Sequence, residues 1–243
     1  MKLFPIHKRP PPVKMWQVPV NKMRLGNIMD DTWDLTLKKV VAHIDGIKDV
    51  RRIAHDADVA LDLTKIALQH LLYYDSILML DIFMFGNIYA PTPEIKDFIS
   101  DKDHMQDECA NYVYINGSRL DDFYLIRLFT SLCTGRNLKE WLKLHMDDGV
   151  RVMDHVDVRR FIQFGLIKGL IYRIHKYAVS SRYISSIAKA ERPAKDSADV
   201  LQKYFDGCHH FDQIMTELNM DDGKIMEHLR KNYPKGDVDI IYR

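Results

Sequence analysis

Two stretches of this chain repeat each other without a gap, and both are interrupted by an Asp-Gly pair. They read HIDGIKDVRRIAHDADV at residues 43–59 and YFDGCHHFDQIMTELNM at residues 204–220. Apolar residues recur on both sides of each glycine at the three- and four-residue spacing of one helix face. Glycine easily adopts the left-handed backbone that ends a helix. The repeat therefore predicts a chain built from small modules of paired helices.

Matching apolar positions in the two stretches predict equivalent cores. The first set is Val40, Ile44, Val50, Ile53, Ala54 and Ala57, and the second set is Leu201, Phe205, Phe211, Ile214, Met215 and Leu218.

The first module is expected to contain three helices. Thr32 or Asp34 is expected to cap the first helix, which Gly46 ends, and Asp49 is expected to cap the second. A third helix over residues 62–74 has an apolar face made of Leu63, Ile66, Ala67 and Leu71.

Residues 76–93 are expected to form the β structure of this module. They read as two strands paired in a hairpin around Gly86-Asn87, and Pro91 and Pro93 close them off. Three helices followed by a hairpin are the element order of a winged-helix domain.

Similar patterns continue along the chain. Helical stripes over residues 125–145 and 158–165 and an alternating segment over 170–179 predict a middle unit, and a helix and a final strand complete the last one. We expect a mainly α fold with small β wings (α+β), in tandem winged-helix-like units. The expected segments are a linker at 1–31, units at 32–95 and 96–180, a loop at 181–196 and a C-terminal unit at 197–243.

The start of the chain is expected to be an extended strap, because residues 5–19 contain five prolines, which fix φ and remove backbone donors. Trp16, a large aromatic residue within this strap, is a candidate for partner contact.

Composition excludes several classes of protein. The net charge of +1 provides no global field toward nucleic acid or anionic lipid, and three cysteines without a CxxC pair disfavour a disulfide framework or a zinc knuckle. We expect a reducing compartment and no transmembrane segment. The phosphate-loop, dinucleotide-binding, HExxH and GxSxG patterns are absent, so we predict no enzyme, cofactor or metal.

Two clusters of reactive side chains are expected to be structural. Cys208, His209 and His210 fall in the loop of the second repeat, so we expect Cys208 to be buried and His210 to lie near the next helix cap. The segment from His145 to Asp157 is rich in His and Asp. The alternative to a structural role for this segment is metal binding or acid–base chemistry. There, Asp147-Asp148-Gly149 reads as a turn and Asp157 as a helix cap.

A basic run supports a further alternative, binding of nucleic acid by residues 159–195. This run contains nine cations and a single acidic residue, Glu191. The cations are Arg159, Arg160, Lys168, Arg173, Lys176, Arg182, Lys189, Arg192 and Lys195. Such a run is equally suited to an acidic protein surface, and Arg159, Arg160 and Arg173 are therefore candidate partner contacts. The near-neutral total charge favours a protein partner over direct nucleic-acid binding.

Several blocks in order resemble one family. HIDGIKDVRRIAHDADV, QHLLYYDSILMLDIFMFGNIYAPTP, RRFIQFGLIKGLIYRIHKY and FDGCHHFDQI are similar to the C-terminal region of nitrogen permease regulator 2 and its animal homologues. The opening KLFP, the proline-rich strap and VPV look like the linker of that family, and the resemblance runs from residue 2 to residue 243.

The resemblance implies a non-catalytic interaction region of a GATOR/SEA complex subunit, which restrains target-of-rapamycin signalling when amino acids are short. It implies a nitrogen permease regulator 3-like subunit and a DEP-domain subunit as partners, with Rag GTPases reached through the complex. It also implies a cytoplasmic protein recruited to the vacuolar or lysosomal surface. GTPase activation belongs in the family to an N-terminal longin-like domain, and we expect this chain to start after that domain.

Overall fold

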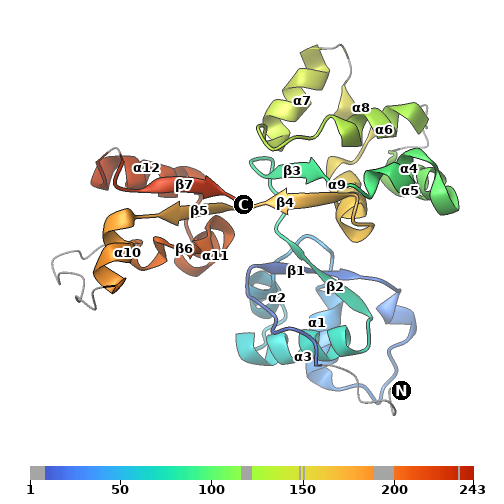
Figure 1. Ribbon diagram of the computed structural model, residues 1–243. Coiled ribbons are helices and arrows are strands. Elements are labelled where there is room, and N and C mark those ends of the chain that lie inside the picture. Colours follow the sequence, from blue (N-terminus) through green and yellow to red (C-terminus); the bar gives the residue numbers. More distant parts are fainter. Residues whose placement is uncertain (1–8, 116–121, 148, 150, 189–199, 235) are drawn as a thin grey trace. The chain divides into compact units, whose positions relative to one another are not determined.

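The computed structural model describes residues 9–115, 122–147, 149, 151–188, 200–234 and 236–243. Helices dominate it, and its β structure consists of small antiparallel sheets of two or three strands (Figure 1). The predicted mainly α, α+β class is therefore confirmed. Among the described residues, we find no helix with the length and apolar character needed to span a membrane.

The described chain divides into two compact units. Unit 1 contains the residues through Ile82 together with Lys176–Ile241, and unit 2 contains Phe83–His175 with Tyr242–Arg243. The winged-helix assignment and the five segment boundaries stay predictions.

The N-terminal part of unit 1 packs three helices against a two-stranded sheet. The helices are α1 (Leu35–Ala42), α2 (Val50–Asp56) and α3 (Leu61–Tyr73), and a short 3-10 helix, η1 (Leu25–Asn27), precedes them. Two of the predicted caps are confirmed: the Asp34 carboxylate accepts two backbone N–H groups at the start of α1, and Asp49 accepts one at the start of α2. The buried core includes Val40, Val50, Ile53, Leu68, Leu71 and Ile77.

The proline-rich strap contributes a strand to this sheet. β1 (Gln17–Asn21) pairs antiparallel with β2 (Ile77–Asp81), so that Gln17 faces Asp81. Pro19 lies within β1, where the missing N–H is tolerated because β1 is an edge strand. Val13, ahead of this strand, is buried in the same core. The strap is thus an integral part of the folded unit.

The predicted hairpin around Gly86-Asn87 is wrong. A turn does form there, since the Asn87 N–H donates to the Met84 carbonyl at 3.0 Å. However, the strands on its two sides pair elsewhere: β2 pairs with β1, and β3 (Ile88–Pro91) pairs with β4 (Ile171–Ile174) in unit 2. Pairing between strands that are distant in sequence therefore replaces the hairpin that the local turn residues predict.

The C-terminal part of unit 1 repeats the helix pair beside a three-stranded sheet. Its sheet has the strand order β6-β5-β7, and β5 is antiparallel to β6. Its elements are β5 (Lys176–Val179), α10 (Ser181–Ala188), η3 (Gln202–Tyr204), β6 (Asp206–His210), α11 (Phe211–Leu218), α12 (Asp222–Asn232) and β7 (Asp239–Tyr242).

The two repeats share a turn contact at their Asp-Gly pairs, although Gly46 lies in a bend after α1 and Gly207 lies within β6. The Asp45 carboxylate accepts the backbone N–H of Ile47, and the Asp206 carboxylate accepts that of Cys208, both at 2.8 Å. The twelve aligned apolar residues are buried or packed against the two cores, as predicted. The expected burial of Cys208 is wrong, because the turn exposes its tip in both repeats, at Ile47 and at Cys208.

Unit 2 is a helical body with one two-stranded sheet, β3 with β4. Its core centres on aromatic residues: the Phe129 and Phe161 rings stack at 4.0 Å between centroids, and Trp141 lies near Phe161. Its helices are α4 (Ile95–Ile99), η2 (Lys102–His104), α5 (Met105–Val113), α6 (Asp122–Thr130), α7 (Leu138–Asp147), α8 (Val152–His155) and α9 (Val158–Ile167).

Candidate protein-docking groove

A groove lies in unit 1 beside α3, with α1 and the chain around η1 as its other walls. It has a volume of about 750 Å³. Apolar side chains dominate its lining, and they include Met23, Ile28, Leu37, Leu63, Ile66 and Tyr74. We call this lined surface the α3 groove. An apolar groove of this size on a folded unit is typical of a binding site for another protein segment or ligand.

The apolar side chains on the α3 side of the groove are strongly exposed. Leu63 is 52%, Ile66 is 62% and Tyr74 is 41% exposed, although all three are large and apolar. Farther around the same helix, Leu68 is buried in the core, and so is Ala67, which also lines the groove. The predicted apolar face of residues 62–74 is therefore half wrong: Ala67 and Leu71 are in the core, whereas Leu63 and Ile66 face outward.

Few polar groups line the α3 groove. Asp34 contributes a carboxylate, whose pKa is held below its ordinary value by hydrogen bonds from Thr36 and from the backbone of Leu37. The His70 ring packs edge-on against Tyr74, with 5.0 Å between ring centroids. Apolar side chains make up most of the lining, so the surface is suited to binding.

Trp16, the predicted contact residue of the strap, lies elsewhere in unit 1. Its ring packs edge-on against His210, with 5.3 Å between centroids, and the Lys14 ammonium lies 5.9 Å from the ring centre. The side chain is partly exposed. Trp16 thus joins the strap to the C-terminal part of unit 1, and its role in partner contact stays a prediction.

The arginines predicted as contacts all lie in unit 2, and their role stays a prediction. Arg159 and Arg160 begin α9, where the Asp157 carboxylate accepts both of their backbone N–H groups, which confirms Asp157 as a cap. The Arg160 guanidinium lies 6.0 Å from the Tyr112 ring. Arg173 on β4 donates to the Asn87 side-chain oxygen at 2.9 Å.

Several cations of the basic run have acidic partners within the chain. Lys168 pairs with Glu108 at 2.6 Å, and Lys176 pairs with Asp222 at 3.0 Å. Lys189, Arg192 and Lys195 fall outside the described residues. In the part of the run that the structure describes, these contacts reduce the charge available for phosphate groups.

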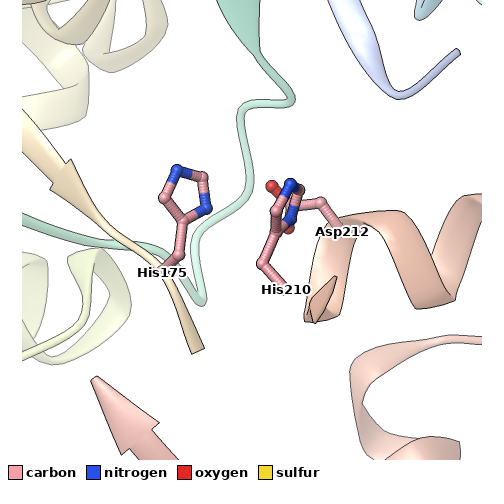
Figure 2. Close-up of side chains that lie close together, drawn as sticks. All are labelled: His175, His210 and Asp212. Carbon is pink, nitrogen blue, oxygen red and sulfur yellow. The ribbon is translucent and has the colours of Figure 1, made fainter. Parts of the chain in front are cut away.

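The predicted loop at Cys208–His210 is wrong, because these residues belong to strand β6, and their three side chains have different surroundings. Cys208 is exposed, whereas His209 Nδ1 lies 2.9 Å from the Asp206 carboxylate. His210 is the N-cap of α11 and accepts the Gln213 N–H, as predicted for a residue near the cap. Figure 2 shows His210 and Asp212 at this helix start; His175, also drawn, belongs to unit 2.

The predicted alternative site at residues 145–157 is divided between structural roles. His145 is buried, with Nε2 3.0 Å from the Ser131 hydroxyl and its ring against Trp141. Asp157 caps α9, and the Asp154 side chain is exposed. Asp148, the centre of the expected turn, lies outside the described residues.

The sequence matches a known family over most of its length. The family model described as Nitrogen permease regulator 2 matches residues 1–123 and 119–233. The chain belongs to the nitrogen permease regulator 2 family. The resemblance noted in the sequence is thereby confirmed.

Relatives from the nitrogen permease regulator 2 family cover nearly the whole chain. The Nitrogen permease regulator 2 homolog of Schizosaccharomyces pombe is 38% identical over 221 residues, which are 90% of this chain and 52% of that protein. The GATOR complex protein NPRL2 of Drosophila melanogaster is 28% identical over 225 residues, 92% of this chain and 50% of that protein. The chain spans about half the length of these two relatives.

Sequence reasoning missed the α3 groove in this family member, although a signal was present. Residues 61–74 contain apolar side chains on more of the helix circumference than one core contact covers, from Leu61 through Tyr74. A helix that is apolar on two faces is expected to pack on two sides. Counting apolar residues around the full helix, instead of along one stripe, indicates the second face.

Proposed function

We propose that this chain is a non-catalytic protein-interaction region of a nitrogen permease regulator 2-like subunit of the GATOR/SEA complex. Family membership and the name of the Drosophila relative, a GATOR complex protein, support the assignment. The observation that carries the interaction role is the α3 groove, which leaves Leu63 and Ile66 largely exposed on an ordered helix. Exposed apolar surface of this kind is stabilised by association with another protein.

The proposed partners are a nitrogen permease regulator 3-like subunit and the DEP-domain subunit of the same complex. Through this complex the chain would act on Rag GTPases and restrain target-of-rapamycin signalling on amino-acid shortage. We place it in the cytoplasm, recruited to the vacuolar or lysosomal surface by its partners. The chain alone is proposed to lack GTPase-activating activity.

Reconstitution tests this function. The chain is co-expressed with each of the two proposed partners and purified by a tag on the partner. We expect co-elution in size-exclusion chromatography with at least one subunit, without acceleration of GTP hydrolysis by Rag GTPases when the chain is added alone. A matched control is an unrelated winged-helix protein with the same tag. Failure to associate with either subunit would contradict the proposal.

A role in nucleic-acid binding predicts a different result for the same purified chain. Binding of a labelled duplex with an affinity that falls steeply as salt rises would favour the basic run as the functional surface. We expect no such binding, because Lys168 and Lys176 already pair with Glu108 and Asp222.

A further inference from the structure

The apolar surface of helix α3 is wide, and only part of it is covered in the described structure. Ala67, Leu68 and Leu71 are buried in the unit 1 core, and Ala67 and Leu71 also line the groove. The exposed part presents Leu63, Ile66 and Tyr74, with His70 between the last two, at intervals of three and four residues. Residues at these intervals form one continuous ridge on a helix. A ridge of large apolar side chains is the surface that a second helix packs against.

The dimensions of the ridge match a short helix. From Leu63 to Tyr74 the ridge is about 16 Å long at the rise of an α-helix, which is about three turns. Side chains at positions i, i+3 or i+4 and i+7 of a partner helix span about 10.5 Å, so they fit within this length. None of the residues that line the α3 groove belongs to a strand, so the groove offers no strand edge for an extended peptide. The geometry therefore favours a helix.

Negative charge lies at the rim of the groove. Asp34 lines the groove, and Asp30 and Asp31 precede it in the same loop. Hydrogen bonds with Thr32 lower the pKa of Asp30, and the pKa of Asp34 is lowered too, so both are ionised at neutral pH. Lys38 lies 3.7 Å from Asp31 and compensates part of this charge. A partner with a cation at one end of its apolar face complements this rim.

We propose that the α3 groove binds one amphipathic α-helix of a partner subunit. Its apolar side chains at i, i+3 or i+4 and i+7 lie against Leu63, Ile66 and Tyr74, and a lysine or arginine flanking them lies beside Asp34. This proposal rests on the proposed function, because it names the chemistry of the segment through which the complex holds this chain.

Site-specific cross-linking tests the identity of the occupant. A benzophenone amino acid replaces Ile66 in the full chain, the complex with the proposed partners is purified and irradiated, and the cross-linked peptide is sequenced by mass spectrometry. We expect one peptide whose sequence has apolar residues at i, i+3 or i+4 and i+7 and a lysine or arginine beside them. A cross-link to a second copy of this chain, to lipid, to a segment without that pattern, or no cross-link at all would overturn the proposal.

Affinity measurements with the captured peptide test the contacts. We expect Ile66→Lys to weaken binding by about tenfold or more, because it places a charge on the apolar ridge. Asp34→Asn keeps a side chain that caps α1 equally well, so its expected loss, about threefold at low salt, reports the charge and disappears at high salt. Ile47→Lys is the matched control, because Ile47 is exposed at 55% in the same unit outside the groove. Equal affinity of all variants would overturn the proposal.

Thermal unfolding and co-purification together distinguish failure of the groove assignment from failure of the proposed function. Thermal unfolding of each variant should match the parent chain, since Ile66 and Ile47 are both exposed and Asn preserves the cap. If Ile66→Lys unfolds at the parent temperature and still co-purifies fully with the partners, the groove assignment fails while the interaction role stands. If the parent chain itself does not associate, the proposed function fails first.

Discussion

Gly46 and Gly207 share one backbone geometry: φ is 74° at both. Each follows an aspartate that accepts backbone N–H groups, and each stands three residues before a helix cap, Asp49 in one repeat and His210 in the other. A positive φ is strained for residues with a Cβ atom. The two repeats therefore depend on glycine at the same point of the same turn.

Alanine at these glycines should destabilise the fold. We expect Gly46→Ala to cost about 1–2 kcal/mol, the usual strain of a left-handed residue. Gly207→Ala should cost more, because an added Cβ would also lie 3.1 Å from a Val179 methyl group. Denaturant unfolding followed by circular dichroism measures both. Gly86→Ala is the control, since Gly86 lacks a positive φ and has no neighbour within 4 Å of an added Cβ; a cost at Gly86 equal to that at Gly207 would contradict the explanation.

Gly165 should resist substitution for a different reason, which is packing in unit 2. A Cβ added there would lie 2.8 Å from the Phe129 ring and 2.9 Å from Ile171. We expect Gly165→Ala to destabilise the chain by about 1–3 kcal/mol through overpacking, despite the helical preference of alanine. Gly223→Ala, in α12 with open space around it, should be neutral or stabilising in the same thermal melts. Equal melting temperatures for the two variants would refute this account.

Acid should weaken the C-terminal part of unit 1 through Glu217. Burial opposes ionisation of this carboxyl, but hydrogen bonds from Tyr204 and Gln213 and the nearby Lys203 charge outweigh burial and hold its pKa below 4.5. A depressed folded-state pKa contributes stability that is present above the unfolded-state value and is lost as pH falls through the folded-state value. Thermal midpoints from about pH 6 to pH 3 should therefore fall less in Glu217→Gln than in the parent chain. A Glu217→Gln curve parallel to that of the parent chain would contradict the role of this carboxylate.

The cysteines should react in an order set by exposure. Cys208 is exposed, whereas Cys109 is fully buried and its thiol pKa is raised, first by burial and then by the Glu108 charge. Because the thiolate is the reactive form, we expect iodoacetamide to modify Cys208 in the native chain and Cys109 only after unfolding. Peptide mass spectrometry of a labelling time course measures this order. Similar rates at the two sites would contradict the described core of unit 2.

Helix starts were predictable because a cap is decided within a few residues. Asp49 and Asp157 each accept N–H groups two or three residues ahead, and the sequence predicted both. The aligned pair Ile53 and Ile214 is buried at 0% in both repeats, as periodicity indicated. Interactions that depend on local spacing can be inferred without knowledge of the fold.

Strand partners and the docking surface were not predictable in the same way. The Gly86-Asn87 turn exists, but pairing of β2 with β1 and of β3 with β4 depends on segments far away in sequence. Leu63 was expected in the core because periodicity identifies an apolar face without stating what covers it. Only the packed structure shows which of the apolar side chains on α3 remain exposed.

The long separation between β3 and β4 has a consequence for biosynthesis. Ile88 faces Ile174 in their ladder, so roughly eighty residues must be translated after the first strand before its partner exists. At common elongation rates this delay is about 4–16 s. Throughout that interval the nascent chain carries Ile88, Tyr89 and Ala90 with no strand to cover them. We expect ribosome-associated chaperones to hold this segment until translation passes Ile174.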